Sequence, residues 1–428
     1  MKKSIRLAAA VASAALAVSA LGATPASAAD EVSIYTGMDA AAITAFQADL
    51  DTWSKTSGVN VKVTRLASFD TDITTKIKAG QEPDIAFWPQ PGGLIAQANA
   101  GKLVDLSTLL GSDLTAIKKT LVSGWDKLAV TKGKLYGLPA AASVKSLVFY
   151  NPANLKKLGY SVPKTDAELQ ALEKKVVADG KAYPWCAGIE SGGATGWPAT
   201  DWVEDYAVKF LGNDYNLWWQ GHIQWSDSRI QKAGKAVAAR LLTKGNTQPG
   251  VASRGFGDAT TAGLFATTKA KGQCLFLKQG SFITSFFPKA VQAEIAKGNY
   301  SRVGVFKLPT PAGAADAVLG AGDVAAAFHN TPAVKKVMSY ILSDKSLSFA
   351  KGGFYLAPHK TVKTSVYPNK LQAQFATILT SAKGFGFDGS DLAPTQVNAT
   401  EWKQLTNWFS GAKTMSQAFK AIDDSYFD

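Results

Sequence analysis

The sequence predicts an α/β protein built from two lobes, each a mainly parallel sheet flanked by helices, and three observations carry this prediction. From residue 31 to about residue 106, strand-like and helix-like patterns alternate at close spacing. Such alternation is typical of a parallel sheet with helices on both faces, which binds ligands where its strands end. A second alternating run begins after residue 152. The 400 residues that follow a 28-residue leader also exceed what one compact core usually holds.

The first 28 residues have the features of a secretory signal peptide. Lys2, Lys3 and Arg6 precede an Ala-rich apolar run, and Ala26-Ser27-Ala28 fits an A-x-A cleavage site. The apolar run is shorter than the ~18 to 20 strongly apolar residues of a membrane-spanning helix. We therefore expect cleavage after Ala28 and an exported protein, periplasmic or extracellular. No lipobox cysteine lies near the cleavage site, so no lipid anchor is expected.

The N-terminal patterns predict three strands and three helices in alternating order. The strands are expected over 31–37, 59–66 and 83–89, and the helices over 41–58, 70–81 and 92–106. Glycines at 58, 80 and 101 mark the helix ends. Because parallel strands end at one edge of a sheet, the segments that follow them are expected to converge. These segments are Thr36-Gly37, Ser68-Phe69-Asp70 and Trp88-Pro89-Gln90.

The rest of the chain predicts a second sheet and one more strand and helix. Further strands are expected within 132–152, 183–189, 274–277, 302–306 and 318–328. Further helices are expected over 166–179, through Asp205, Ala238 and Leu264, and over 332–349. GFGFDG at 384–389 matches G-x-G-x-x-G, but a helix-like stretch precedes it and no helix follows. This order favours a loop over a dinucleotide site.

The charge of the chain does not favour a nucleic-acid partner. The formal net charge is +13, and the leader supplies three of these charges. Only six of the 46 basic residues are Arg, the residue favoured for bidentate contacts to bases and phosphates, and no basic run exceeds two residues. A diffuse lysine surface is typical of a protein that stays in solution or is held loosely at an anionic envelope.

Cys186 and Cys274 are the only cysteines. An even number of cysteines in an exported chain favours a disulfide. Two separate buried thiols are the alternative.

The sequence lacks the usual signals of catalysis. Its three histidines, His222, His329 and His359, are too widely spaced for a metal motif, and no G-x-S-x-G or P-loop sequence occurs. Glu190, Asp201, Glu204 and Asp323 could nominally supply the two carboxylates of a glycosidase, but such a pair arises easily by chance among 33 acidic residues. No catalytic residue, metal or cofactor is therefore predicted.

Five stretches resemble a known family. The stretches 78–106, 133–152, 321–350 and 352–360 are similar to the extracellular solute-binding proteins of ABC importers, in the large sugar-binding group. CAGIESGGATGWPATDWVEDY at 186–206 looks like the branch that takes up α-glucosides. The resemblance implies a periplasmic-binding-protein-like fold that holds a saccharide between its lobes and delivers it to a membrane permease.

The resemblance also implies how the chain is divided. Crossings between lobes are expected near 145–151, 305–309 and 352–356. Lobe 1 would comprise residues 29–146 and 309–352, and lobe 2 residues 147–308 and 353–428. A monomer is expected. Relatives from Gram-positive bacteria usually carry a lipidated N-terminal cysteine, which this chain lacks.

SGGATGWPATDW, residues 191–202, is the best candidate for a segment that contacts the ligand. Its glycines allow close approach of the backbone, and Pro198 lies near the start of a helix that Thr200 or Asp201 could cap. A sugar presents hydroxyls and a flat patch of C–H groups, so its receptor needs polar groups and aromatic faces. We expect Trp197 to face the cleft, and Asp201 to be either a cap or a hydroxyl acceptor.

Other candidates for ligand contact lie at strand ends, on a crossing or beside glycines. They are Phe69, Asp70, Trp88, Gln90, Tyr150, Glu190, Asp323, Phe354 and Tyr355. Each also has a packing alternative, since large aromatic residues are usually buried. We assign Phe87, Phe149, Trp202 and Phe328 to the core and His359 to a structural role.

These observations favour a receptor that closes on an α-glucoside without transforming it. A secreted carbohydrate-active enzyme is one alternative, and it would release products on long incubation. A receptor of the same fold for a charged solute is another, and its affinity would depend on salt.

Overall fold

The alternating N-terminal patterns form three parallel strands, as predicted. β1 (Asp30–Thr36) pairs with β2 (Val59–Arg65) on one side and with β3 (Ile85–Trp88) on the other. The intervening helices are α1 (Ala40–Ser57), α2 (Phe69–Lys78) and α3 (Pro91–Asn99). Every residue of β3 is buried because helices cover both faces of the sheet. The computed structural model describes residues 30–122 and 124–426, so the signal-peptide prediction lies outside the described residues.

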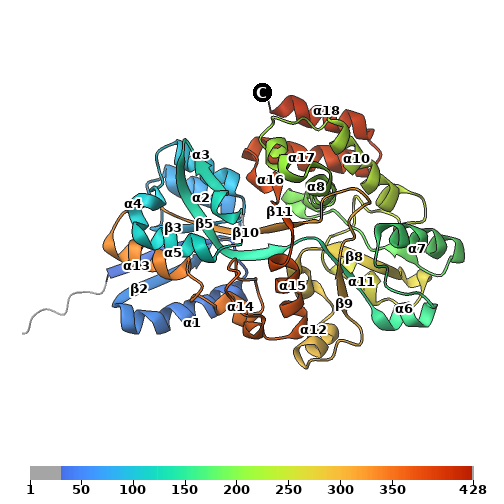
Figure 1. Cartoon of the computed structure of the whole chain (residues 1–428), viewed down its shortest axis with the longest axis horizontal. Helices are drawn as coiled ribbons and strands as arrows, with labels where there is room; N and C mark the ends of the chain where they lie inside the picture. Colours follow the sequence, from blue (N-terminus) through green and yellow to red (C-terminus); the bar gives the residue numbers. More distant parts are fainter. Residues whose placement is uncertain (1–29, 123, 427–428) are drawn as a thin grey trace, which may run out of the picture.

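These strands belong to a seven-stranded sheet with the order β2-β1-β3-β10-β5-β4, in which β11 also pairs with β10. The additional strands are β4 (Ala129–Thr131), β5 (Lys134–Val144), β10 (Ala317–Ala327) and β11 (Gly384–Phe387). The helices around this half are α4 (Leu106–Leu110), α5 (Ser112–Thr120), α13 (Pro332–Ile341) and α14 (Ser348–Gly352). Most of this half lies to the left in Figure 1, and β11 lies near the centre.

The second sheet has the order β7-β8-β6-β9. Its strands are β6 (Leu147–Tyr150), β7 (Tyr183–Trp185), β8 (Cys274–Gln279) and β9 (Gly304–Lys307). The helices between these strands are α6 (Pro152–Leu158), α7 (Asp166–Asp179), α8 (Trp197–Leu211), α9 (Tyr215–Trp219), α10 (Ser228–Val237), α11 (Asp258–Phe265) and α12 (Lys289–Ala296). The C-terminal helices are α15 (Lys370–Thr380), α16 (Gly389–Leu392), α17 (Thr395–Phe409) and α18 (Met415–Ser425).

The chain passes between the two sheets at Lys145 and Ser146, which separate β5 from β6. It returns between β9 and β10, and Figure 1 shows β5 and β10 running across the middle of the molecule. The two passages are hydrogen-bonded to each other. Lys145 N donates to Leu319 O at 2.8 Å, Leu319 N donates to Ser146 Oγ at 2.7 Å, and Leu308 N donates to Ser146 O at 2.9 Å. The exact lobe boundaries stay a prediction.

Both sheets are mixed rather than mainly parallel, which differs from the expectation. β10 runs antiparallel to β3 and β5, and β6 runs antiparallel to β8 and β9. The physical reason is the crossing itself, because a strand that returns from the other half enters the sheet from the opposite end.

Two further segments differ from the predictions. GFGF at 384–387 is not a loop but β11, which runs parallel to β10, and the short helix α16 follows it. Its glycines are required by packing, since a Cβ built at Gly386 lies 2.8 Å from both Tyr215 and Val208 side-chain atoms. The helix expected over 332–349 is interrupted between α13 and α14, where Ser343, Asp344 and Ser346 favour a turn.

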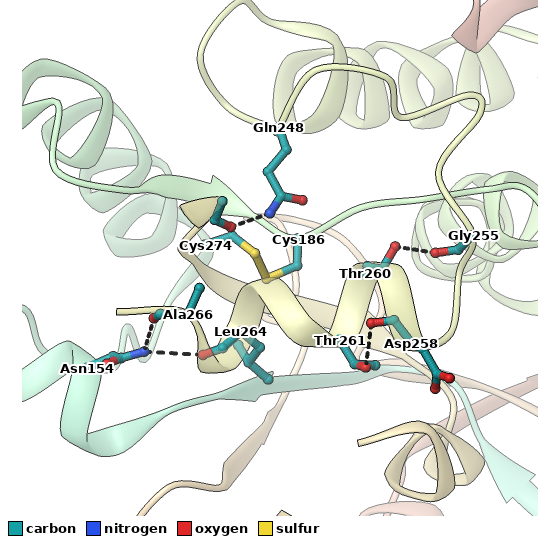
Figure 2. Close-up of a disulfide and its surroundings, with 11 residues drawn as sticks. Asn154, Cys186, Gln248, Gly255, Asp258, Thr260, Thr261, Leu264, Ala266 and Cys274 are labelled. Atoms are coloured by element: carbon teal, nitrogen blue, oxygen red, sulfur yellow. Dashed lines mark hydrogen bonds between the residues drawn. A yellow bond between two sulfur atoms is a disulfide. The ribbon is translucent and has the colours of Figure 1, made fainter. Parts of the chain in front are cut away.

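The predicted disulfide joins Cys186 to Cys274. Cys186 directly follows β7, and Cys274 is the first residue of β8. The bond therefore links two neighbouring parallel strands of the second sheet. Figure 2 shows α11 lying over the sulfur atoms. A Cβ built at Gly263 of α11 would lie 2.6 Å from Cys274 Sγ, so only glycine fits there.

Removing this disulfide should destabilise the protein without changing its fold. The bond closes a loop of 88 residues, for which the chain-entropy relation gives about 4 to 5 kcal/mol. We expect Cys186→Ser combined with Cys274→Ser to lower the free energy of unfolding by about this amount in urea. Dithiothreitol should lower the melting temperature of the wild type and leave that of the variant unchanged. Equal melting temperatures of oxidised and reduced wild type would contradict the prediction.

Candidate functional site

The segments that follow β1, β2 and β3 converge, as predicted, but their aromatic residues are packed. A Cβ built at Gly37 lies 3.0 Å from Phe69 Cβ, and the Phe69 and Trp88 rings meet edge to face at 5.8 Å. Trp88 also lies 5.8 Å from the Phe328 ring and is 1% exposed. Phe69 and Trp88 therefore form the support of this edge, and a direct role in ligand contact stays a prediction.

Asp70 and Gln90 are the polar groups that this edge presents. Asp70 is exposed in the first turn of α2, and Gln90 is half-buried at the N-terminus of α3. With its amide nitrogen turned toward Asp70, Gln90 donates to the two carboxylate oxygens at 2.7 and 3.2 Å. Neighbouring groups crowd this carboxyl, and the resulting desolvation raises the pKa of Asp70.

The opening of α8 brings Trp197 to the junction of the two halves. Gly196 is the N-cap, with φ of 115°, and a Cβ there would lie 2.7 Å from Trp402 C. Pro198 occupies the first turn, as predicted. The expectation that Thr200 or Asp201 caps the helix is wrong, because α8 begins earlier, and Thr200 Oγ1 instead donates to Trp197 O at 2.8 Å.

Trp197 is half-buried among two aromatic rings and one lysine. Its ring lies 4.8 Å from Phe256, edge to face, and 5.8 Å from Phe282. Lys145 Nζ, on the passage between the sheets, lies 5.2 Å from the centre of the Trp197 ring. The flat ring of Phe282 packs on Gly280, where a Cβ would lie 2.9 Å from Phe282 Cδ1. Trp197 therefore keeps part of its surface accessible beside the crossing.

Lys145 is the charge around which the junction is built. Its Nζ donates to Asp201 Oδ1 at 2.8 Å and to Asp388 Oδ2, and all three residues are at most 6% exposed. Burial alone would lower the pKa of Lys145, but the Asp201 and Asp388 carboxylates hold it well above its usual value. The sequence analysis gave no role to Lys145 or Asp388, because the two residues are 243 positions apart and no local pattern indicates that they pair.

Asp201 forms an ion pair with Lys145, but one of its carboxylate oxygens has no hydrogen-bond partner among the described residues. Burial raises its pKa to about 6, although the Lys145 charge opposes the shift. Lys278 Nζ donates to the backbone oxygen of Asp201 at 2.6 Å, while Asp201 Oδ2 has no hydrogen-bond partner among the described residues. This oxygen is buried with unused capacity to accept a hydrogen bond, and Asp201 lies one helical turn beyond Trp197.

The segment 388–391 completes this side of the junction. Glu204 of α8 accepts hydrogen bonds from Gly389 N at 2.8 Å and Ser390 N at 3.1 Å. Asp391 is half-buried, and burial followed by repulsion from Asp388 raises its pKa. The Asp70 charge, which comes from α2 of the first half, adds to this repulsion. We call Asp70, Gln90, Lys145, Trp197, Asp201, Asp388 and Asp391 the junction site.

A second layer fastens the crossing to α8. Asp205 lies one turn beyond Asp201 and accepts from Ser146 Oγ at 2.9 Å. Lys278 Nζ lies 3.2 Å from Asp205 Oδ2, and Lys209 pairs with Asp205 Oδ1. All of these groups are buried, so the passage between the sheets is held in one position relative to α8.

Asp323 of β10 and Tyr355, which follows α14, lie outside the junction site. Asp323 of β10 is 6% exposed, and burial raises its pKa to about 7. The half-buried Tyr355 meets Phe349 edge to face at 5.7 Å, and burial followed by the Asp323 charge raises its pKa. Phe354 packs on Gly352, with 2.6 Å between a Cβ built there and Phe354 Cδ2. Contact of these residues with a ligand stays a prediction.

Tyr150 and Glu190 are not part of the junction site. The Tyr150 ring packs over Gly304 of the neighbouring strand and lies 5.9 Å from the Phe306 ring. Glu190 belongs to the loop that precedes Trp197 and accepts from Gly192 N at 2.7 Å. Of the residues assigned to the core, Phe87, Phe149, Trp202 and Phe328 are buried, and His359 is buried with its Nδ1 2.8 Å from Thr120 Oγ1.

One large surface groove lies away from the junction site. A groove of about 790 Å³ on the outer face of the first half is lined by residues that include Trp53, Lys335 and Tyr340. In residues 30–122 and 124–426, no group of His, Cys, Asp and Glu is arranged to hold a metal ion. Within the same ranges, no helix combines the length and the apolar character needed to cross a bilayer.

Sequence comparisons relate the chain to solute receptors. Residues 39–347 match the model of a family described as bacterial extracellular solute-binding protein. The chain is 35% identical over 381 residues to the alpha-glucosides-binding periplasmic protein AglE of Rhizobium meliloti, covering 85% of this chain and 80% of that protein. It is 33% identical over 388 residues to the osmoprotective compounds-binding protein GgtB of Synechocystis sp., covering 87% of each.

Structural comparisons confirm the two-lobed fold. The bacterial solute receptor AcbH, described with a preference for β-D-galactopyranose, has a TM-score of 0.74 at 19% identity, covering 93% of this chain and 98% of that one. A chitin oligosaccharide binding protein has a TM-score of 0.72 at 19% identity, with the same coverage. The cyclic alpha-maltosyl-1,6-maltose binding protein of Arthrobacter globiformis has a TM-score of 0.67 at 17% identity, covering 92% and 97%.

Replacing Lys145 should destabilise the protein strongly. Lys145→Met leaves the Asp201 and Asp388 carboxylates buried without their cation, which typically costs about 3 to 5 kcal/mol. Lys118→Met is the matched control, since Lys118 pairs with Asp126 at 3.3 Å on the surface and its loss should cost less than about 1 kcal/mol. Urea unfolding at neutral pH measures both. Equal losses would show that the buried pairs contribute no more than a surface pair.

Asp323 should make stability depend on pH. Its pKa is about 7 in the folded chain and about 3.9 in an unfolded one, so the folded state binds the proton more tightly. The stabilisation is present below pH ~4 and is lost as the pH rises through about 7, at on the order of 1 kcal/mol per pH unit. Asn cannot ionise, so Asp323→Asn should be more stable than the wild type at pH 8 and similar at pH 4.

Urea unfolding from pH 4 to 8 tests this dependence. Asp51→Asn, at an exposed position on α1, is the control and should leave the pH profile of the wild type unchanged. An Asp323→Asn profile parallel to that of the wild type would contradict the assignment.

Proposed function

We propose that this chain, which belongs to the family of bacterial extracellular solute-binding proteins, captures a di- or oligosaccharide with α-linked glucose for an ABC importer. The observation that carries the proposal is the arrangement of side chains in the first turns of α8. There a half-exposed tryptophan and a buried carboxylate oxygen without a partner lie one helical turn apart.

Family membership establishes the class of the protein. Its members are extracellular receptors of ABC transporters, so the chain is a binding protein and not an enzyme. Its partners are a solute and the membrane permease of such a transporter. The saccharide, and the α-glucoside in particular, are the finer proposal.

The junction site has the two kinds of group that a saccharide requires. The Trp197 ring offers an apolar face for the C–H patch of a pyranose, and Phe256 and Phe282 hold it in place. Asp201 Oδ2 can accept a hydrogen bond from a hydroxyl, and such charge-assisted bonds are stronger than neutral ones. On the opposite side, Asp70 and Gln90 provide further polar atoms.

Binding then acts through closure of the two lobes. A saccharide that touches α8 on one side and the Asp70 and Gln90 pair on the other makes all its contacts only when the lobes are together. The closed population rises by as much as the saccharide binds the closed state better than the open one. The passages at Lys145 and Ser146 hold the α8 side of the site in register throughout.

The names of the two relatives point to two kinds of ligand. One is named for α-glucosides and the other for osmoprotective compounds, at similar identity. A small osmoprotective compound is therefore the second candidate. It would use the same Trp197 face and Asp201 acceptor but fewer contacts across the junction.

A binding screen with a tryptophan variant tests the proposal. Maltose, trehalose, sucrose and longer α-glucans should raise the melting temperature, with small polyols and phosphate esters as the comparison set. Because one stacked ring contributes ~1 to 3 kcal/mol in base stacking, Trp197→Ala should weaken saccharide binding by about 5- to 150-fold in titration calorimetry. Trp53→Ala is the control, since Trp53 stacks on Tyr340 at 5.0 Å on the outer face.

The salt dependence distinguishes a neutral from a charged ligand. Affinity for a neutral saccharide should be nearly the same at low and moderate ionic strength, whereas affinity for an ion should fall. The saccharide should also be recovered unchanged after long incubation. A shift with a charged solute and none with any saccharide would overturn the proposal.

A further inference from the structure

The first turn of α3 lies directly against the backbone that ends α16. A Cβ built at Gly92 would overlap the Ala393 carbonyl oxygen and would lie 2.9 Å from Ala393 C and 3.0 Å from Leu392 O. Real Cβ atoms essentially never come within 3.0 Å of such atoms. Gly92 is not among the residues with positive φ, so its own backbone does not require glycine. The contact with 392–393 is what excludes a side chain.

The two sides of this contact follow strands of the same sheet, β3 and β11, but α16 is also bound to helices α8 and α17 beside the second sheet. α3 follows β3 of the seven-stranded sheet directly. α16 is held by Glu204 of α8 through Gly389 N and Ser390 N, and by Asn398 of α17 through Ser390 O. Figure 1 shows α3 and α16 facing each other between the two halves.

We propose that Gly92 is a positioning residue for ligand-driven closure, because its missing side chain lets α3 meet α16 backbone to backbone. This inference rests on the proposed function, since the saccharide drives the closure that the contact completes.

On both sides, the contact between Gly92 and Ala393 lies two residues from a member of the junction site. Gln90, which faces Asp70, is the residue at which α3 begins, two positions before Gly92. Asp391 precedes Ala393 by two positions on the other side. A saccharide that engages Gln90 and α8 together therefore holds Gly92 against Ala393. A methyl group at position 92 would hold the two elements apart.

Two neighbouring glycines provide a matched pair of variants. Gly92→Ala introduces the overlap, whereas a Cβ at Gly93 lies 3.5 Å from the Trp88 ring, an ordinary contact. Both changes should strengthen α3 slightly, because Ala favours a helix over Gly. We expect both variants without ligand to melt at or slightly above the wild-type temperature.

Affinity is the first measurement. The titration uses the saccharide that gives the largest shift of the wild-type melting temperature, beginning with maltose and trehalose. Gly92→Ala should bind it about 5- to 150-fold more weakly, because overpacking a close contact typically costs about 1 to 3 kcal/mol. Gly93→Ala should match the wild type within about twofold. Small-angle scattering should show compaction on saccharide addition for Gly93→Ala and little for Gly92→Ala. Equal affinity and compaction of the two variants would overturn the inference.

A second measurement needs no ligand. Ala96 and Thr395 are exposed on the two sides of a groove of about 580 Å³ between α3 and α17. With Ala96→Cys and Thr395→Cys, a short bis-maleimide should trap the closed arrangement, while Cys186 and Cys274 do not react because they are paired. Trapping should be slower with Gly92→Ala than with Gly93→Ala.

The outcomes separate the two proposals. If the wild type binds no saccharide, the proposed function fails, and the trapping rates still decide the role of Gly92. If the wild type binds a saccharide and the two variants trap equally fast, only the inference fails. A lower melting temperature of ligand-free Gly92→Ala would show that the contact belongs to the fold itself, which also overturns the inference.

Discussion

The buried ammonium of Lys145 is the constraint on which the junction depends. A charge removed from water must be paired, and the pairing must also satisfy hydrogen-bonding capacity. Lys145 meets this requirement with Asp201 and Asp388, which come from α8 and from the end of β11. The passage between the sheets, the start of α8 and the C-terminal segment are therefore fixed relative to one another by a single side chain. Because Trp197 is the first residue of α8, its position depends on this arrangement.

The junction is organised in two layers with different tasks. Asp205, Lys209, Lys278 and Ser146 are buried and form ion pairs and hydrogen bonds that tie the crossing to α8. One turn earlier, Asp201 keeps one oxygen without a partner, and Trp197 keeps part of its face open. A site that is held rigid before the ligand arrives loses less entropy on binding. The inner layer supplies the rigidity and the outer layer supplies the unsatisfied groups.

Glycines decide how closely the elements around the site can approach. Gly196 lets the start of α8 rest on Trp402, Gly280 gives the Phe282 ring a flat support, and Gly92 admits the carbonyl of Ala393. At each position a Cβ would overlap its neighbour. The aromatic and polar residues of the site are common residue types. They can act together only because the glycines let the elements that carry them pack closely.

The sequence by itself determined most of the local elements and the class of fold, and it favoured the pairing of the cysteines. The periods of apolar residues at 31–106 are set by neighbours a few positions apart, so they survive without tertiary information. Trp197 could be singled out because glycines and a proline surround it. Only the tertiary structure decided which residues meet. Lys145 and Asp388 are 243 positions apart, and the packing of Trp88 against Phe69 and of Tyr150 over Gly304 is likewise not visible in their local sequence. Burial and pairing over such separations depend on how strands cross between sheets, and no local pattern encodes that.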